Sequence, residues 1–103
     1  MASPSAGCNP AVGVLTLEIH VEDSHSLKDK RNVVRSLKDR LRAKFNVSVA
    51  EIDGHGTWTR SVVAVVTVAK DREYAEQLLQ AVESEAESLL GGVLTGSGVE
   101  WLS

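Results

Sequence analysis

The chain has 103 residues and a formal net charge of −3, with 43% hydrophobic and 24% charged residues. This length and composition predict one small globular domain with a single core. Its one cysteine excludes an internal disulfide and a cysteine-based zinc site. No apolar run reaches the ~18 residues of a transmembrane helix, and the start lacks the basic and apolar regions of a signal peptide. We therefore expect no membrane partner and a cytoplasmic location.

The net charge hides a strong asymmetry along the chain. Residues 26–45 contain eight Lys or Arg and two Asp, a net charge of +6. The remaining residues contain three Lys or Arg and twelve Asp or Glu, a net charge of −9. One segment is thus a basic island on an acidic protein, and the overall charge does not reveal it.

The first half of the chain predicts a tail, a strand and a helix. Residues 1–11 are small, polar and rich in Gly and Pro, which indicates a flexible tail before a single domain at 12–103. Residues 12–21 alternate between apolar and polar, as in a strand with one buried face. Ser26 is placed to cap a helix, and the spacing of apolar residues predicts that this helix runs to Lys44.

The second half predicts a hairpin, a helix and a last strand. Residues 46–53 and 58–69 are rich in β-branched residues and are separated by a turn with two glycines, which predicts a β-hairpin. Asp71 is placed to cap a helix over residues 72–90, and Gly91 to end it. Residues 93–102 predict an irregular edge strand.

This order of elements predicts a ferredoxin-like α+β fold, βαββαβ, with a four-stranded antiparallel sheet and two helices on one face. The other face of the sheet is then open. The strand at 58–69 is apolar on both sides, which suggests that the open face is also covered. We expect a homo-oligomer, with a dimer as the first choice. Val63, Val65 and Trp58 are expected at its interface. The alternative is that the tail or the last strand folds over this face.

The first helix carries the main candidate site. At about 100° per residue, five cations fall within an arc of about 80° and form a ridge about 21 Å long. These residues, called the basic ridge below, are Lys28, Arg31, Arg35, Lys38 and Arg42. Such a ridge can bind nucleic-acid phosphates. Two alternatives stay open: a solvated surface partly neutralised by the acidic second helix, or a site for an acidic protein.

Other chemistry finds little support in the sequence. The stretches expected at the centre of the sheet, VLTLEIHV at 14–21 and RSVVAVVTV at 60–68, have no aromatic side chains. RNA bases could therefore not stack there as on an RNA-recognition motif. Nucleophile, phosphate-loop and histidine metal motifs are absent. Glu18 and His20 share one face of the first strand and are the one candidate acid/base pair. We expect a non-enzymatic protein with no metal and no cofactor.

Two strings resemble the YlxP-like family, small bacterial proteins that are catalogued as a domain of unknown function. They are HSLKDKR at 25–31 and KFNVSVAE at 44–51, followed by Trp58. The matching positions are Ser26, Lys28, Lys30, Arg31, Asn46, Ser48, Glu51 and Trp58. The resemblance covers about residues 12–90 and implies a ferredoxin-like fold in a bacterial cytoplasmic protein. It also implies genes beside those of translation initiation and ribosome maturation factors, and it supplies no catalytic residues.

Together these observations predict an accessory factor of translation or the ribosome that contacts RNA phosphates through the basic ridge. The alternative is a homo-oligomeric module that binds protein through the open sheet face.

Overall fold

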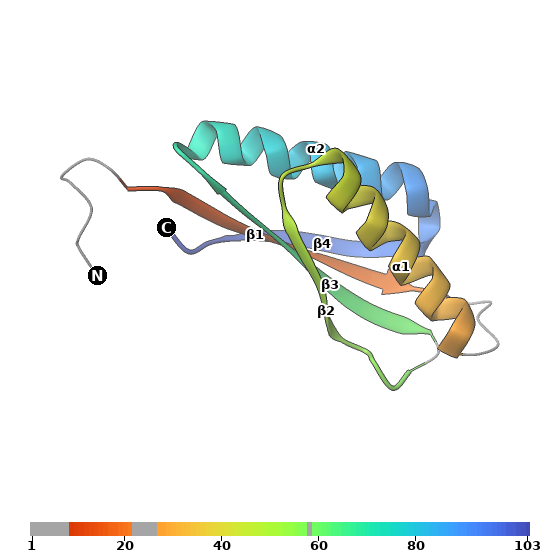
Figure 1. Cartoon of the computed structure of the whole chain (residues 1–103). Helices are drawn as coiled ribbons and strands as arrows, with labels where there is room; N and C mark the ends of the chain where they lie inside the picture. Colours follow the sequence, from red (N-terminus) through yellow and green to blue (C-terminus); the bar gives the residue numbers. More distant parts are fainter. Residues whose placement is uncertain (1–8, 22–26, 58) are drawn as a thin grey trace.

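The computed structural model describes residues 9–21, 27–57 and 59–103 (Figure 1). Its elements are β1 (Ala11–His20), α1 (Leu27–Lys44), β2 (Ser48–Asp53), β3 (Arg60–Ala69), α2 (Arg72–Leu90), a short 3₁₀-helix (Gly91–Val93) and β4 (Leu94–Trp101). The predicted order of strands and helices is confirmed, and every predicted element end lies within two residues of the observed one.

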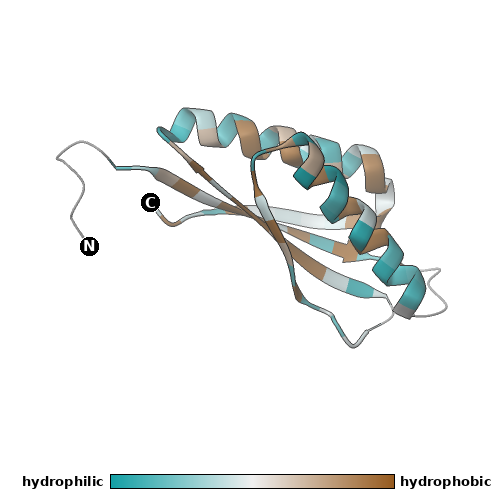
Figure 2. Ribbon diagram, viewed as in Figure 1, coloured by the Kyte–Doolittle hydropathy of each residue, from teal (hydrophilic) through white to brown (hydrophobic). Residues whose placement is uncertain are grey.

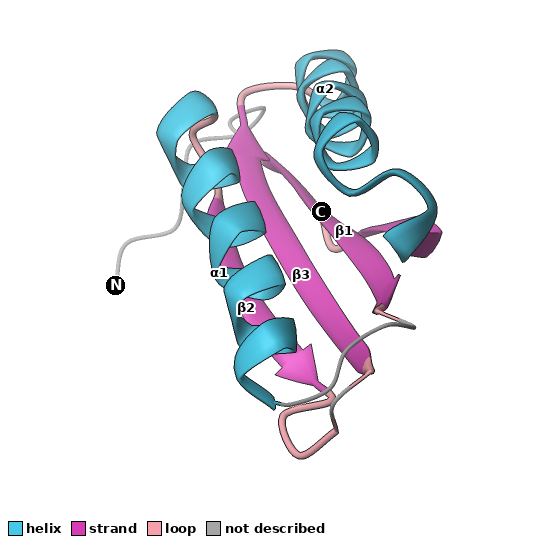
Figure 3. Cartoon of the chain, turned by 90° about the vertical axis from the view of Figure 1, so that its right-hand side faces the viewer, coloured by secondary structure: helices cyan, strands magenta, loops and turns pink. Residues whose placement is uncertain are grey.

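The four strands form one antiparallel sheet in the order β2-β3-β1-β4. Both helices lie on the same face of it, α1 over β2 and β3 and α2 over β1 (Figure 3). This arrangement confirms the ferredoxin-like prediction. It also makes β2 and β4 the two edges of the sheet, with a different helix above each.

The core fills the space between the helices and the sheet. Because successive side chains of a strand point to opposite faces, Leu15, Leu17 and Ile19 of β1 all face the helices and are at most 1% exposed. On α1 the buried side chains recur at helical spacing, as Leu37 and Leu41 show. In Figure 2 the apolar colour follows β1 and β3, whereas β4 is paler.

Local signals fix the ends of α2 as the sequence predicts. The carboxylate of Asp71 accepts a hydrogen bond from the backbone N–H of Tyr74 at 2.8 Å, so it caps the first turn. Gly91 ends the helix with φ of 57°, a conformation that favours glycine. The predicted cap at Ser26 of α1 lies outside the described residues.

The predicted interface on β3 is wrong for two of its three residues. Val63 and Val65 are fully buried in the core, because the register pairs them with Leu17 and Leu15 on the helix side of the sheet. The open face carries the other set of apolar side chains from β3. That set consists of Val62, Ala64, Val66 and Val68. Trp58, the third predicted residue, lies outside the described residues.

The start of β1 shortens the predicted tail by one residue. Ala11 is buried and pairs with Ala69, so it belongs to the sheet. Residues 1–8 lie outside the part of the chain that the structure describes. Among the described residues, no helix combines the length and the apolar character that crossing a membrane requires.

Candidate functional site

The basic ridge lies on the side of α1 that faces away from α2. Arg42 shows this direction, because its guanidinium donates a hydrogen bond of 2.7 Å to the backbone oxygen of Val49 in the edge strand β2. Lys38 is half-buried, and the other ridge residues are exposed. Lys28, Arg31, Arg35 and Lys38 form no ion pair or hydrogen bond with another described side chain.

A separate pair of cations on α1 faces the acidic helix α2. Arg40 and Lys44 lie 3.1 Å and 3.0 Å from the two carboxylate oxygens of Glu85. Hydrogen bonds from Lys44 and then from Arg40 hold the pKa of Glu85 below its usual value. One carboxylate of the acidic helix thus pairs with these two cations and offsets part of their charge, whereas the basic ridge keeps its charge.

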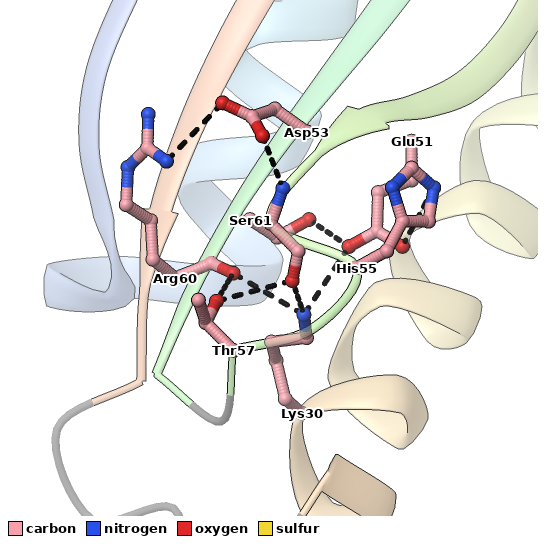
Figure 4. Close-up of polar contacts among 8 residues, drawn as sticks. Lys30, Glu51, Asp53, His55, Thr57, Arg60 and Ser61 are labelled. Carbon is pink, nitrogen blue, oxygen red and sulfur yellow. Dashed lines mark hydrogen bonds and ion pairs between the residues drawn. The ribbon is translucent and has the colours of Figure 1, made fainter.

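A buried lysine joins the start of α1 to the hairpin of β2 and β3 (Figure 4). Lys30 is 1% exposed, and its ammonium group donates hydrogen bonds to the backbone oxygens of Gly54 and, at 3.2 Å, of Arg60. It also lies 3.5 Å from a carboxylate oxygen of Glu51. Three acceptors thus surround a group with three N–H donors, so the buried charge is both paired and hydrogen-bonded.

Further polar contacts hold Glu51 and the turn in place. The Ser61 hydroxyl donates to Glu51, and the His55 ring lies 3.6 Å from the other carboxylate oxygen of Glu51. Gly54 has φ of +88°, and a side chain on it would collide with the backbone of Arg60. The turn therefore depends on glycine at this position.

Asp53 closes the outer side of the same hairpin. Its carboxylate accepts a hydrogen bond of 2.8 Å from the N–H of Gly54 and lies 3.3 Å from the guanidinium of Arg60. The bond from Gly54, followed by the bond and the charge of Arg60, holds the pKa of Asp53 below its usual value. Arg60 is thus paired and adds little free positive charge to the surface.

The sequence prediction missed the role of Lys30, although a signal was present. Lys30 precedes Val34, Leu37 and Leu41 by four, seven and eleven residues, so it occupies the buried face of α1 and not the ridge. A lysine on an apolar stripe needs a buried acceptor. Which acceptors it finds depends on the hairpin that packs against the helix.

The cluster around Lys30 is built to position neighbouring groups. Its described polar groups bind one another, and the described residues contain no group of three or more side chains that could hold a metal ion. What the cluster fixes is the first turn of α1 relative to the hairpin. Lys28 and Arg31 are carried by that turn.

The candidate acid/base pair lies elsewhere, on the open face of the sheet. Glu18 and His20 are both exposed, and β3 pairs them with Val62 and Arg60. The hollow beside Glu18 is lined by Thr16, Ser97 and Gly98 as well, and His20 is not part of its lining.

Solved structures define the class of protein to which this fold belongs. A de novo designed protein, Foldit4, matches with a TM-score of 0.58 and 14% identity, over 92% of this chain and 98% of its own. A C-terminal segment of the alpha subunit of aIF2 from Pyrococcus abyssi matches with a TM-score of 0.50 and 18% identity, over 90% of this chain and 49% of its own. At these identities the likeness shows the open-faced α+β sandwich and no activity.

Sequence comparison goes further and shows the family. Residues 12–95 match the family described as "Protein of unknown function (DUF503)". The chain is also 33% identical to the "Uncharacterized protein YlxP" of Bacillus subtilis (strain 168) over 90 residues, which are 87% of this chain and 98% of that protein. The chain therefore belongs to the DUF503 family, which confirms the YlxP-like resemblance. The two strings that carry the resemblance meet in the structure, since Lys30 of the first contacts Glu51 of the second.

Proposed function

We propose that this protein is a non-enzymatic accessory factor that contacts the phosphates of structured RNA through the basic ridge. One observation carries the proposal. Lys28, Arg31, Arg35 and Lys38 follow one another along α1 without a carboxylate partner among the described residues, although the chain as a whole is acidic.

The geometry of the ridge suits phosphates better than bases. Steps of three and four residues separate its cations by about 4.5–6 Å along the helix axis, which places a line of charges against a sugar–phosphate strand. Neutralising phosphates releases counterions and favours binding without base contacts. Arginine adds a planar donor group that suits phosphate oxygens. The central strands β1 and β3 offer no aromatic side chain for stacking bases.

We place the action of this protein near the ribosome, in the cytoplasm. A role near the ribosome is supported by the gene neighbourhood that the family resemblance implies. The cytoplasmic location likewise stays a prediction.

The test is binding to ribosomal RNA fragments at 50 and 200 mM salt. Reversing Arg31 and Arg35 to Glu should remove most of the binding, and Lys38→Glu in addition should abolish it. The slope of log K against log salt should fall by about 0.7–0.9 for each phosphate that the variant no longer neutralises. Arg42 is left unchanged because it also binds the edge of β2.

A matched control keeps the charge change and moves its position. Lys70→Glu with Arg72→Glu alters the net charge as much as Arg31→Glu with Arg35→Glu, at the start of α2 instead of along α1. If both double variants weaken binding equally, only overall charge matters and a specific ridge is ruled out. If neither does, the proposal is wrong.

A second candidate function is a homo-oligomeric module that uses the open sheet face. The observation in its favour is the exposure of large apolar side chains there, with Val68 of β3 at 62%. Val66 and Ala64 lie on the same face of that strand. Sedimentation should then give a mass above 11.0 kDa, and Val68→Glu should return the protein to a monomer. A monomer at about 0.1 mM would contradict this candidate.

A further inference from the structure

The outer edge of β4 is an open strand edge. Leu102 donates its N–H to the backbone oxygen of Val12, so its backbone groups point toward β1. In an antiparallel pair, the N–H and C=O groups of successive residues point to alternate sides of the strand, so every second residue of β4 counted from Leu102 also points them toward β1. Ser97, Val99 and Trp101 therefore direct their backbone N–H and C=O groups outward. No hydrogen bond reaches these backbone groups from another described part of the chain.

Two hollows lie along this edge, between β4 and α2. One, of about 250 Å³, has Leu15, Leu79, Val99 and Trp101 among its lining residues. The next, of about 400 Å³, includes Glu87, Gly91 and Ser97. Val99 is 49% exposed although its side chain points to the helix side of the sheet, where its partner Leu15 is fully buried. The hollows therefore leave apolar surface uncovered beside a free backbone edge.

The helix wall of this groove is negatively charged. Glu76 and Glu83 line the first hollow and Glu87 the second, and these three carboxylates lie on one flank of α2. The nearby cation, Arg72, stacks over the ring of Trp101 at 4.3 Å. Glu83 also accepts a hydrogen bond from the Ser97 hydroxyl, which ties the helix wall to the strand.

We propose that an extended, basic segment of a partner protein binds here as a fifth strand beside β4. Its backbone pairs with Ser97, Val99 and Trp101, as in peptide recognition by strand addition. Every second side chain then enters the groove. Lysine or arginine suits these positions, because the stem covers Val99 and the charged end reaches Glu76 or Glu83.

A second copy of this chain is the less suitable occupant. Pairing β4 with β4 around a two-fold axis would place two acidic α2 helices near each other, which costs energy. The basic edge of the molecule, β2, has its outward oxygen of Val49 already bound by Arg42. The charge of the groove therefore selects a basic partner from outside.

The probe is a capped eight-residue peptide of alternating lysine and valine, added to the full ¹⁵N-labelled chain. Amide shifts should change in β4 and along the groove side of α2, and the amides of Ser97, Val99 and Trp101 should exchange more slowly with solvent. The same peptide with glutamate for lysine should bind at least about tenfold more weakly. Methylating alternate backbone nitrogens of the lysine peptide should abolish binding, because it removes the donors of the added strand.

Variants of the protein separate the backbone and charge contributions. Val99→Pro removes an outward N–H that has no partner in the sheet and should abolish binding. Val99→Thr keeps the N–H, loses only part of the apolar surface and should weaken binding far less than Val99→Pro. Glu76→Gln and Glu83→Gln should each weaken binding about threefold. Glu100→Gln is the matched control, because Glu100 lies on the same strand but on the open face and should leave the affinity unchanged.

Several results would overturn the proposal. They are a lysine peptide that fails to bind at about 1 mM, equal binding by the glutamate or N-methylated peptide, and shifts centred on another surface. Self-association through β4, seen as the same slowed amides in the protein alone at high concentration, would also overturn it in favour of a second copy. None of these outcomes depends on whether the basic ridge binds RNA.

Discussion

The two edges of the sheet differ although the same fold builds both. At the β2 edge, α1 carries the basic ridge, Arg42 binds an outward backbone oxygen, and Lys30 ties helix to hairpin. At the β4 edge, α2 presents glutamates over hollows, and the outer backbone groups of the strand have no partner among the described residues.

This contrast shows that protection of a strand edge depends on side chains and not on topology. Long cationic side chains can cover a strand edge and donate hydrogen bonds to its outward backbone oxygens. Glutamates cannot serve the outward oxygens of β4, because both groups are hydrogen-bond acceptors. Gly96 and Gly98 further reduce the side-chain cover of β4. The following experiments test this contrast.

The largest effect is expected at the buried lysine. Lys30→Met removes a fully buried charge, its ion pair with Glu51, and the hydrogen bonds that it donates to the backbone oxygens of Gly54 and Arg60. Breaking one partner of a buried pair costs about 3–5 kcal/mol. Urea unfolding measures the loss, and Lys28→Met, at an exposed position of the same helix, should change stability by less than about 0.5 kcal/mol. Equal losses in the two variants would show that Lys30 does not hold the hairpin.

A smaller loss of stability is expected from overpacking the core beneath β4. A side chain on Gly13 would lie 2.8 Å from both Leu79 and Trp101, so Gly13→Ala should displace the ring and destabilise the fold. Such overpacking costs about 1–3 kcal/mol. Gly98→Ala is the control, since a Cβ there meets no atom within 4 Å. If thermal unfolding shows the same midpoint for both variants, Trp101 is not packed tightly against β1.

Removing the side chain that covers the β2 edge should lower the stability of the fold by less than either change above. Arg42→Ala removes the hydrogen bond to Val49 and should lower the free energy of unfolding by about 1 kcal/mol. It also exposes an outward oxygen of β2, so light scattering at high concentration should rise. Arg35→Ala removes an equal charge without that hydrogen bond and should do neither. A similar loss of stability in both variants would mean that Arg42 does not protect the edge.

The smallest effect concerns the ion pairs between the two helices. Because the pKa of Glu85 is lowered in the folded protein, its pairs with Lys44 and Arg40 stabilise the fold above the unfolded value of 4.5. That contribution is lost as the pH falls through the lower, folded pKa. Thermal unfolding should therefore separate the parent from Glu85→Gln at pH 7 and bring them together at low pH. If the two unfolding midpoints differ by the same amount at both pH values, the ion pairs of Glu85 do not stabilise the folded protein.

Much of the fold could be predicted because its signals are local. The alternation in β1, the spacing of Leu37 and Leu41, the cap at Asp71 and the stop at Gly91 each involve a few neighbouring residues. The basic ridge follows in the same way from the repeat of an α-helix. The family resemblance rests on two strings, and the contact between them through Lys30 and Glu51 appears only in three dimensions.

The errors and omissions concern relations between elements. The sequence prediction places Val63 and Val65 on the open face because β3 is apolar on both sides, and a two-residue period cannot say which side is covered. The groove beside β4 is absent from the sequence prediction. Its walls come from α2 and β4, and its depth depends on how far apart they pack.

Local sequence patterns are enough to predict the order of the elements, the phase of each helix and the separation of positive from negative charge, because each depends on backbone period and composition. Packing between elements settled which face of β3 is buried, which cations of α1 pair with α2, and which acceptors Lys30 finds on the hairpin. The physical reason is that burial and charge pairing are properties of two surfaces in contact. A periodic pattern describes only one of them.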